Sequence, residues 1–439
     1  MNELVAEYRD FLNKGKTERE CVREIIALAE KYGYTDIQGK DSLKAGDKVY
    51  YTQYGKSIAL FNVGSRPIED GMNILGAHID SPRLDVKMKP LYESDGIVYL
   101  DTHYYGGIKK YQWLAHPLAI HGVVVKKDGT QVDICLGEDD DNAFCISDLL
   151  PHIAQDQMKK TASEFIAGED LDLIVGLASK TDDEKEKDAG KKAVLSVLNE
   201  KYGIEEDDFL SAELEIVPSG RAKLMGLDGS MVLAYGQDDR VCAFTSLDAM
   251  LKTECVERTA CCLLVDKEEI GSVGSTGMNS VFFENASAEL LARMDRGYDG
   301  LKLRRMMRNS SMLSSDVNSA YDPLNASLFD KKNSSFLSGG VVFNKYTGAR
   351  GKSGASDANA EFVAALRAKM DERNVKFQMA EMAKVDVGGG GTIAKFADYY
   401  GMQVIDCGVA VLSMHAPWEI TSVEDIISAD ECYKAFLTL

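Results

Sequence analysis

Apolar residues along this chain fall into two patterns, short continuous runs and repeats at helical spacing, and their mixture is typical of an α/β protein. The continuous runs predict buried strands over residues 57–63, 72–75, 261–265 and 403–412. Repeats at helical spacing predict helices over residues 3–33 and 357–370. In the first of these, Thr17 and Glu20 have the spacing of a capping box, and Gly33 would end the helix.

The pattern changes after Pro90, where shorter β-type segments replace the long runs. The β segments predicted in this block cover residues 97–100, 118–126, 131–136, 171–177 and 213–217. Residues 127–130 would form a hairpin turn between two of them, and residues 193–202 a helix. Residues 180–192 are charged and lack aromatic side chains, so we expect an exposed loop there.

The same block holds no cluster of potential catalytic residues. Its histidines, at positions 103, 116, 121 and 152, are scattered and fit ordinary surface or core positions. We therefore expect residues 91–235 to form an inserted domain that serves assembly. It would interrupt a domain made of residues 1–90 and 236–439.

Composition narrows the class of protein further. A chain of 439 residues is long enough for two domains. Its formal charge of -20 argues against a nucleic-acid or anionic-membrane partner, because either would require a basic surface. The nine cysteines include no Cys-x-x-Cys pair, which indicates reduced thiols. With no signal pattern at the N-terminus and no apolar run of membrane-spanning length, we expect a cytoplasmic protein.

Side chains that can bind a metal or move a proton follow the predicted strands or begin the next helix. They are His78, Asp80, Asp238, Glu268, Glu269, Asp316 and His415. Each alone has an ordinary explanation: Asp238 would cap a helix, and Glu268 would be a surface charge. Because ligand crevices form at the carboxyl ends of strands in α/β sheets, we expect these residues to meet. Apart from Asp80, which would orient the His78 imidazole, they supply two imidazoles and four carboxylates, a set that suits two hydrolytic metal ions of the zinc type.

Three other classes of site are disfavoured. The chain has no His-Glu-x-x-His, the motif of a one-zinc site on a helix, and no Gly-x-Ser-x-Gly, the motif of many serine hydrolases. Gly351-Lys352-Ser353 resembles the end of a phosphate loop. However, Tyr346 stands where that loop requires its first glycine.

The order and wording of the motifs resemble the aspartyl aminopeptidases, the eighteenth family of metallopeptidases. The motifs are Gly-Ala-His78-Ile-Asp80-Ser-Pro, Asp238-Asp239, Glu268-Glu269-Ile-Gly, Ser-Asp316 and Ser-Met-His415. The resemblance covers nearly the whole chain. It implies a two-zinc exopeptidase that removes N-terminal residues from peptides. It also implies a zinc aminopeptidase-like catalytic domain with a mixed central sheet flanked by helices, an inserted and mainly β dimerisation domain, and a tetrahedral dodecamer built from dimers.

The resemblance also implies a role for each motif residue. The implied ligands are His78, Asp238 and Asp316 for one metal ion, and Asp238, Glu269 and His415 for the other. Asp238 would bridge the two ions, Asp80 would orient the imidazole of His78, and Glu268 would be the general base. Two Zn²⁺ ions are expected, with Co²⁺ or Mn²⁺ as alternatives.

The substrate pocket departs from the family pattern. Asp156 stands where characterised members carry a histidine that reaches a neighbouring subunit's active site. Lys345 is the nearest match to the lysine that would read an acidic substrate side chain. Gly390 lies in a run of four glycines, whose backbone could approach a ligand closely. These departures leave open whether N-terminal Asp or Glu is preferred.

Two other functions remain alternatives at this point. The first is a related two-metal enzyme, either an aminopeptidase of different specificity or a deacylase of small amides. The second is a non-catalytic assembly shell that keeps the fold. A shell would be expected to carry a damaged ligand set, and none of the ligand motifs is damaged here.

Overall fold

The computed structural model describes residues 2–138, 142–178, 188–294 and 298–439. They form two compact units, which are described separately. The first unit comprises Met1–Asp80, Ala222–Met414 and Glu419–Leu439, and the second comprises Ser81–Arg221 and His415–Trp418. The longer segment of the second unit begins and ends earlier in the chain than the insert expected at residues 91–235, and the short segment His415–Trp418 adds to it.

The first unit is built on a mixed sheet with the strand order β1-β2-β3-β13-β4-β14-β18-β16-β17. The strands are β1 (Thr35–Asp36), β2 (Lys48–Gln53), β3 (Ser57–Asn62), β4 (Met72–His78), β13 (Thr259–Val265), β14 (Ser311–Ser314), β16 (Val341–Asn344), β17 (Phe377–Met379) and β18 (Gln403–Gly408). The neighbours β13, β4, β14 and β18 are parallel, with Val265 paired to His78 and Ser314 to Gly76. Their carboxyl ends therefore lie along one edge of the sheet.

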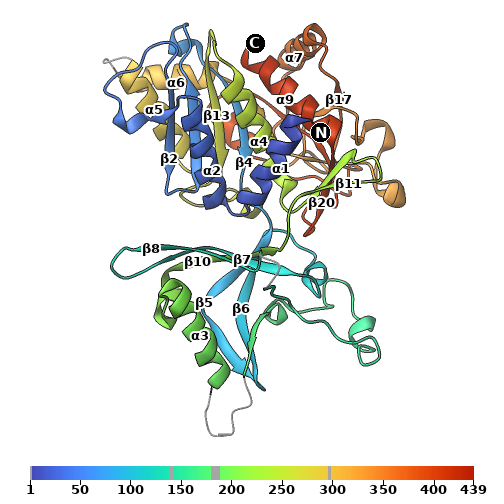
Figure 1. The fold of residues 1–439 in the computed structure, drawn as a ribbon. Helices are drawn as coiled ribbons and strands as arrows, with labels where there is room; N and C mark the ends of the chain where they lie inside the picture. Colours follow the sequence, from blue (N-terminus) through green and yellow to red (C-terminus); the bar gives the residue numbers. More distant parts are fainter. Residues whose placement is uncertain (1, 139–141, 179–187, 295–297) are drawn as a thin grey trace. The chain divides into compact units, whose positions relative to one another are not determined.

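Helices cover both faces of this sheet, which explains why its strands are continuously apolar. Along β3, Ile58 and Leu60 pack into one core and Ala59 and Phe61 into the other. The first core includes helices α1 (Glu3–Lys14), α2 (Glu18–Lys31), α4 (Gln237–Lys252), α7 (Ala360–Arg373) and α9 (Val423–Leu437). The second includes α5 (Phe282–Met294), α6 (Gly300–Asn309) and α8 (Ala394–Asp398). Figure 1 shows α2 and α4 against the strands, and the predicted α/β class is confirmed.

The single helix expected over residues 3–33 is wrong, because two helices occupy this stretch. The first ends at Lys14, and Gly15 caps it. The capping box is confirmed: the Thr17 side chain accepts a hydrogen bond from the Glu20 N–H, and the Glu20 side chain accepts one from the Thr17 N–H. This cap requires extended backbone at Thr17, with φ -117° and ψ 161°, so one helix cannot run through it.

A smaller sheet of the first unit brings distant segments to the start of α4. Its strands, in order, are β11 (Lys223–Met225), β12 (Met231–Ala234), β20 (Glu419–Ser422), β19 (Ala410–Leu412) and β15 (Asn318–Ser319). Strands β12 and β20 are antiparallel, and Ala234 pairs with Glu419. Because Ala234 is followed by Tyr235, Gly236 and then α4, this pairing sets Glu419 beside the first turn of that helix.

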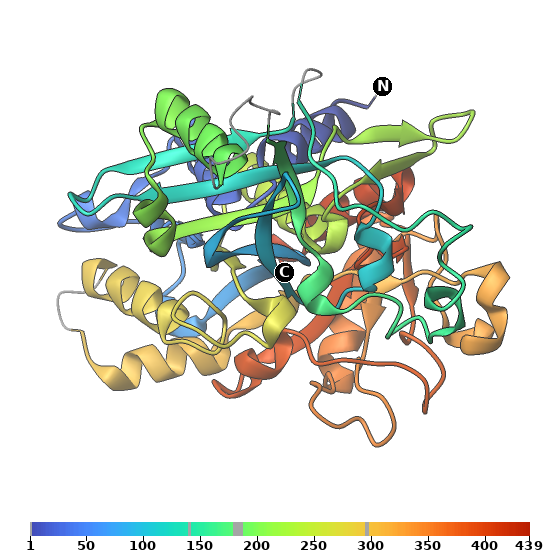
Figure 2. The same ribbon diagram turned by 90° about the horizontal axis from the view of Figure 1, so that it is seen from below.

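The second unit is an antiparallel sheet with one helix on it. The strands, in order, are β8 (Gln131–Leu136), β7 (Leu118–Val125), β10 (Ala212–Pro218), β5 (Arg83–Ser94), β6 (Ile97–Tyr105) and β9 (Leu173–Leu177). Helix α3 (Ala189–Tyr202) lies across this sheet (Figure 2) and begins earlier than the helix expected from residue 193. Most of the exposed loop expected over residues 180–192 lies outside the described residues.

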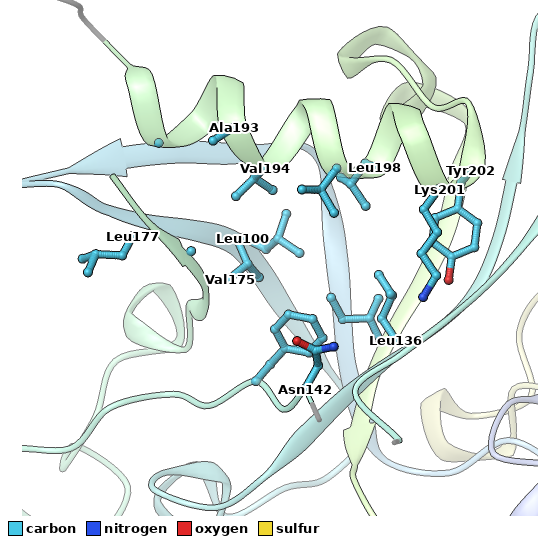
Figure 3. Close-up of a pocket in the computed structure, with 15 residues that line it drawn as sticks. Leu100, Leu136, Asn142, Val175, Leu177, Ala193, Val194, Leu198, Lys201 and Tyr202 are labelled. Atoms are coloured by element: carbon cyan, nitrogen blue, oxygen red, sulfur yellow. The ribbon is translucent and has the colours of Figure 1, made fainter. Parts of the chain in front are cut away.

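Helix α3 does not fill the space above the sheet. A cavity of about 350 Å³ lies between it and the strands, and its walls are mostly apolar, with Asn142, Lys201 and Tyr202 as polar exceptions (Figure 3). At one end the helix approaches closely, because a Cβ on Gly176 would come 2.7 Å from Val194. At the other end the Tyr202 hydroxyl donates a hydrogen bond to the Cys135 carbonyl oxygen, 3.1 Å away.

Candidate metal centre

The carboxyl edge of the parallel strands positions most of the predicted site residues. His78 is the last residue of β4, and its register partner Val265 ends β13. The turn after β13 carries Glu268 and Glu269, and the turn after β14 carries Asp316. The first turn of α4, which follows strand β12 of the smaller sheet, adds the carboxylates of Asp238 and Asp239. Elements far apart in sequence therefore meet at one edge.

Two groups of potential ligands form at this edge. His78, Asp239 and Asp316 make one group, and His78, Asp238 and Glu269 make the other. Within each group the ligand atoms all lie within 4.8 Å of one another. Imidazole nitrogen and carboxylate oxygen are donors that Zn²⁺ accepts readily, so the donor chemistry of this edge fits zinc.

The His78 imidazole is buried and held from both of its nitrogens. Its Nδ1 lies 3.0 Å from the carbonyl oxygen of Asp80 and 3.3 Å from Oδ1 of the same residue. Its Nε2 lies 3.2 Å from Asp238 Oδ1 and 4.0 Å from Glu268 Oε2. Burial lowers the pKa of His78, but the hydrogen bonds with Asp238 and Asp80 and the Glu268 charge outweigh it, so the pKa is raised well above its ordinary value.

Asp80 joins the exits of two strands. Its Oδ1 accepts the Glu268 N–H at 3.1 Å, and its Oδ2 accepts the Glu269 N–H at 3.2 Å. One carboxylate thus fixes the main chain of both glutamates while its residue also orients the His78 ring. This arrangement makes Asp80 a positioning residue for the whole edge.

Asp239 and Asp316 show the electrostatic cost of this crowding. Burial raises the pKa of the Asp239 carboxyl well above its ordinary value, and the charge of Asp316 adds to the effect. Burial also raises the pKa of Asp316, and the opposing effect of His78 does not cancel it. Among the described residues, the buried Oδ1 of Asp239 has no hydrogen-bond partner. A divalent cation would relieve this crowding, so the site fits a metal on electrostatic grounds as well.

Asp239 was not among the ligands expected from the sequence. The signal was its place next to Asp238, but adjacent residues on a helix point in different directions. The backbone of Asp238 is not helical, with φ -79° and ψ 108°. In this conformation Asp238 reaches Nε2 of His78 while Asp239 Oδ2 accepts the main-chain N–H of His78 at 3.3 Å.

His415 and Asp156 lie outside both groups of ligands. His415 belongs to the second unit, where its Nδ1 lies 2.9 Å from the Gly107 carbonyl oxygen. Asp156 is also in the second unit, and its side chain is 96% exposed and paired with Lys159 Nζ at 2.9 Å.

Lys345 and Gly390, the other two residues expected in the substrate pocket, lie in loops of the first unit. Lys345 follows β16, and its Nζ lies 2.6 Å from Asp357 Oδ1. The exposed Gly390 donates its N–H to the Thr347 carbonyl oxygen at 3.1 Å. This bond ties the glycine-rich segment to the loop that carries Lys345. No helix in the described part of the chain is long and apolar enough to cross a membrane.

Known proteins share both the sequence and the fold. Residues 11–437 match the family model described as aminopeptidase I zinc metalloprotease (M18). A probable M18 family aminopeptidase 1 of Clostridium acetobutylicum is 54% identical over 435 residues, which cover 98% of this chain and 93% of that protein. The M18 aminopeptidase structure from Thermotoga maritima is 43% identical, with a TM-score of 0.94 and coverage of 99% and 95%. The S. cerevisiae mApe1 dodecamer, 21% identical with a TM-score of 0.78 and coverage of 99% and 96%, shares the fold.

Proposed function

Because this chain belongs to the M18 family of zinc metalloproteases, we propose that its carboxyl-edge cluster binds two Zn²⁺ ions and hydrolyses the N-terminal peptide bond of peptides. Membership itself makes the chain a metal-dependent aminopeptidase, a hydrolase. The observation that carries the finer proposal is that two groups of potential ligands overlap at His78, which gathers donors for more than one ion in one place. The His78 ring has only Nε2 left for a metal, so Asp238, whose carboxylate has an oxygen for each ion, is the residue that would be shared.

The proposed ligands are the five residues that the motifs single out. His78, Asp238 and Asp316 would hold one ion; Asp238, Glu269 and His415 would hold the other. Both histidines support this assignment through Nδ1, which lies beside a carbonyl oxygen, that of Asp80 for His78 and that of Gly107 for His415. A carbonyl at Nδ1 fixes the tautomer that offers Nε2 to a metal. When bound, the ions supply Lewis acidity, which polarises a peptide carbonyl and lowers the pKa of water.

Glu268 is the proposed general base. Its main chain is fixed by Asp80, and its Oε2 lies 4.0 Å from His78 Nε2, at the centre of the cluster. From there its carboxylate takes a proton from the attacking water and delivers it to the leaving amine. Asp80 contributes by holding the main chain of Glu268 and Glu269 through the two N–H groups that its carboxylate accepts.

An acidic N-terminal residue is the substrate preference proposed from the resemblance, with Lys345, Asp156 and Gly390 in the pocket. The ammonium group of Lys345 is already paired with Asp357. A substrate Asp or Glu would therefore compete with Asp357 for this charge. If that competition is unfavourable, the enzyme will accept other N-terminal residues.

A substrate panel tests the function and the preference together. The zinc-loaded protein is offered aminoacyl anilides with acidic, apolar and basic residues, beside N-acyl amino acids. We expect cleavage of anilides that carry a free amine, fastest for Asp or Glu, and loss of activity when a chelator removes zinc. Cleavage of the N-acyl amino acids alone would indicate a deacylase, and no turnover by the metal-loaded protein would indicate a non-catalytic shell.

Assembly and location extend the proposal. The S. cerevisiae relative is a dodecamer, and we propose a homo-oligomer, a tetrahedral dodecamer built from dimers, for this chain. The cysteines of the chain are free thiols in the structure, which supports a reducing compartment such as the cytoplasm. The formal charge of -20 argues against a nucleic-acid or anionic-membrane partner. The mass of the particle in solution tests the assembly.

A further inference from the structure

The first turn of α4 is held by a buried carboxylate that belongs to neither ligand group. Glu419, the first residue of β20, is fully buried, and its Oε2 accepts the Asp238 N–H at 2.9 Å. The main-chain carbonyl oxygen of the same residue accepts a hydrogen bond from Gln237 Nε2 at 2.6 Å. Two consecutive residues of the α4 turn, Gln237 and Asp238, are therefore bound to one residue of the smaller sheet.

We propose that Glu419 is a positioning residue for the metal centre, one that fixes the direction of the Asp238 carboxylate by holding its main chain. This inference rests on the proposed function, because it concerns how a metal ligand is oriented. Asp238 Oδ1 lies 3.2 Å from His78 Nε2, so a small rotation of the Asp238 backbone would move it away from the cluster. The Glu419 carboxylate restrains that rotation.

The backbone at this turn needs such a restraint. An α-helix leaves its first N–H groups without partners inside the helix, and Asp238 is one of these. Asp238 has φ -79° and ψ 108°, and Asp239 has φ -114° and ψ 25°, so neither is helical. This conformation is what lets both carboxylates reach His78. Glu419 accepts the N–H of Asp238 and is therefore placed to hold this conformation.

Glu419 is itself held rigidly. Its strand pairs with β12, where Ala234 is its register partner. Gln237 Nε2 also donates to the Val232 carbonyl oxygen at 3.1 Å. The Tyr8 hydroxyl of α1 donates to Gln237 Oε1 at 3.1 Å, which adds the N-terminal helix to the network. Strands β20 and β12 and helix α1 thus support the hydrogen bond that the Asp238 N–H donates to Glu419.

The test compares Glu419→Ala with Glu419→Gln in the full-length protein. The glutamine keeps an oxygen that can accept the Asp238 N–H, whereas the alanine removes it. We expect Glu419→Ala to weaken zinc binding and lower kcat by about 10–100-fold, and to change the visible absorption of the Co²⁺-substituted protein. Glu419→Gln should stay within about threefold of the wild type in zinc affinity and keep its Co²⁺ spectrum.

Asn62→Ala is the matched control for a loss of fold stability. Asn62 is buried in β3 and bonds to the carbonyl oxygens of Met250 and Thr253, away from the ligands. Its loss should lower the melting temperature without changing the Co²⁺ spectrum of the folded protein. A Glu419→Ala variant that binds zinc as the wild type does, or a Glu419→Gln variant as weak as the alanine, would overturn the role of Glu419. A wild type that binds no zinc would overturn the proposed function as well.

Discussion

The carboxyl edge of the first unit and the polar face of the second unit's sheet both gather histidines and acids, but they balance charge differently. In the first unit, the Asp238, Asp239, Glu269 and Asp316 carboxylates surround the imidazole of His78. In the second unit, cross-strand register aligns His103, Asp85, Glu215 and His121, and the Arg83 side chain lies beside the two acids. The first arrangement concentrates negative charge, whereas the second neutralises it.

The second unit shows how a chain balances buried acids by itself. Arg83 Nε lies 2.8 Å from Asp85 Oδ1 and 3.2 Å from Glu215 Oε2, and its guanidinium packs 3.9 Å from the Tyr105 ring. On the next strands, His121 Nε2 lies 3.1 Å from Glu138 Oε1. Such a cluster requires no added ion. The acids around the His78 imidazole carry an excess of negative charge that a bound metal cation would balance. The sign of the residual charge therefore distinguishes a structural cluster from a metal site.

The largest effect should come from removing the proposed base in the first unit. We expect Glu268→Gln to lower kcat by about 10³-fold or more, because the amide cannot accept a proton from water. Bound zinc, measured by elemental analysis, should stay at the wild-type level. Glu138→Gln in the second unit is the control and should keep wild-type turnover. Residual activity near the wild type in Glu268→Gln would refute the assigned base.

Breaking the balanced cluster should affect stability instead of chemistry. Arg83→Ala would leave Glu215 buried without its cation, which costs about 3–5 kcal/mol of unfolding free energy. Urea unfolding measures the loss, and zinc content should not change. Arg66→Ala removes an exposed ion pair with Glu257 and should cost at most about 1 kcal/mol. An equal loss of unfolding free energy in Arg83→Ala and Arg66→Ala would show that the buried Arg83 cluster stabilises the fold no more than an exposed ion pair does.

Asp80 connects the two halves of the proposed zinc site, so its change should have an intermediate effect. In Asp80→Asn, one of the two oxygens that accept the Glu268 and Glu269 N–H groups becomes an NH₂ group that cannot accept. We expect kcat to fall by about 10–100-fold while the fold is retained. Circular dichroism checks the fold and steady-state kinetics give kcat. A variant with unchanged kcat would show that the main chain after β13 is fixed by other contacts.

The smallest effect should come from changing Asp430, which lies in a cluster of two acids and two lysines in the first unit. Lys434 Nζ lies 2.6 Å from Asp430 Oδ2 and 3.2 Å from Asp248 Oδ2, and Lys252 Nζ lies 2.6 Å from Asp248 Oδ1. Burial raises the pKa of Asp430 to about 7, with the Lys434 hydrogen bond opposing it and Asp248 adding to it. The folded protein therefore binds this proton more tightly than the unfolded chain. The resulting stability is present below about pH 4 and is lost as the pH rises to about 7.

The variant Asp430→Asn removes this dependence. Between pH 5 and pH 8, its unfolding free energy should improve relative to the wild type by about 1–3 kcal/mol. Urea unfolding at the two pH values measures the change. A constant difference between the proteins would show that Asp430 does not titrate in this range.

Much of the first unit could be predicted from sequence because its signals are local. Strands buried on both faces read as continuous apolar runs, and β3, β4, β13 and β18 were anticipated in this way, although the run over residues 403–412 divides into β18 and β19. His78 ends β4 and Glu269 follows β13, whereas Asp238 begins α4 and Asp316 follows β14, so the order of all the motifs was needed to anticipate that these residues cluster. The family model that matches residues 11–437 confirms the resemblance that the motifs carried.

What the sequence did not reveal depends on contacts between distant segments. The break between α1 and α2 is an exception with a local signal: the apolar repeat stops at Leu12 and resumes at Cys21, and the cap at Thr17 starts the second helix. The direction of the Asp239 side chain depends on the non-helical backbone of Asp238 and Asp239, at a place where the sequence predicts the start of a helix. Glu419 depends on the pairing of β12 with β20, and no local pattern records a partner so far away in the chain.

The place of Asp80 in the chain has a consequence for protein engineering. Asp80 is the last residue of the first unit before the chain enters the second at Ser81, and His415 opens the short segment that returns to the second unit. Two residues of the proposed chemistry therefore stand at the covalent junctions between the units. A chimera that exchanged the second unit for that of a relative would have to be spliced so that Asp80 and His415 are kept, because a graft that altered either residue would lower activity even if both halves folded.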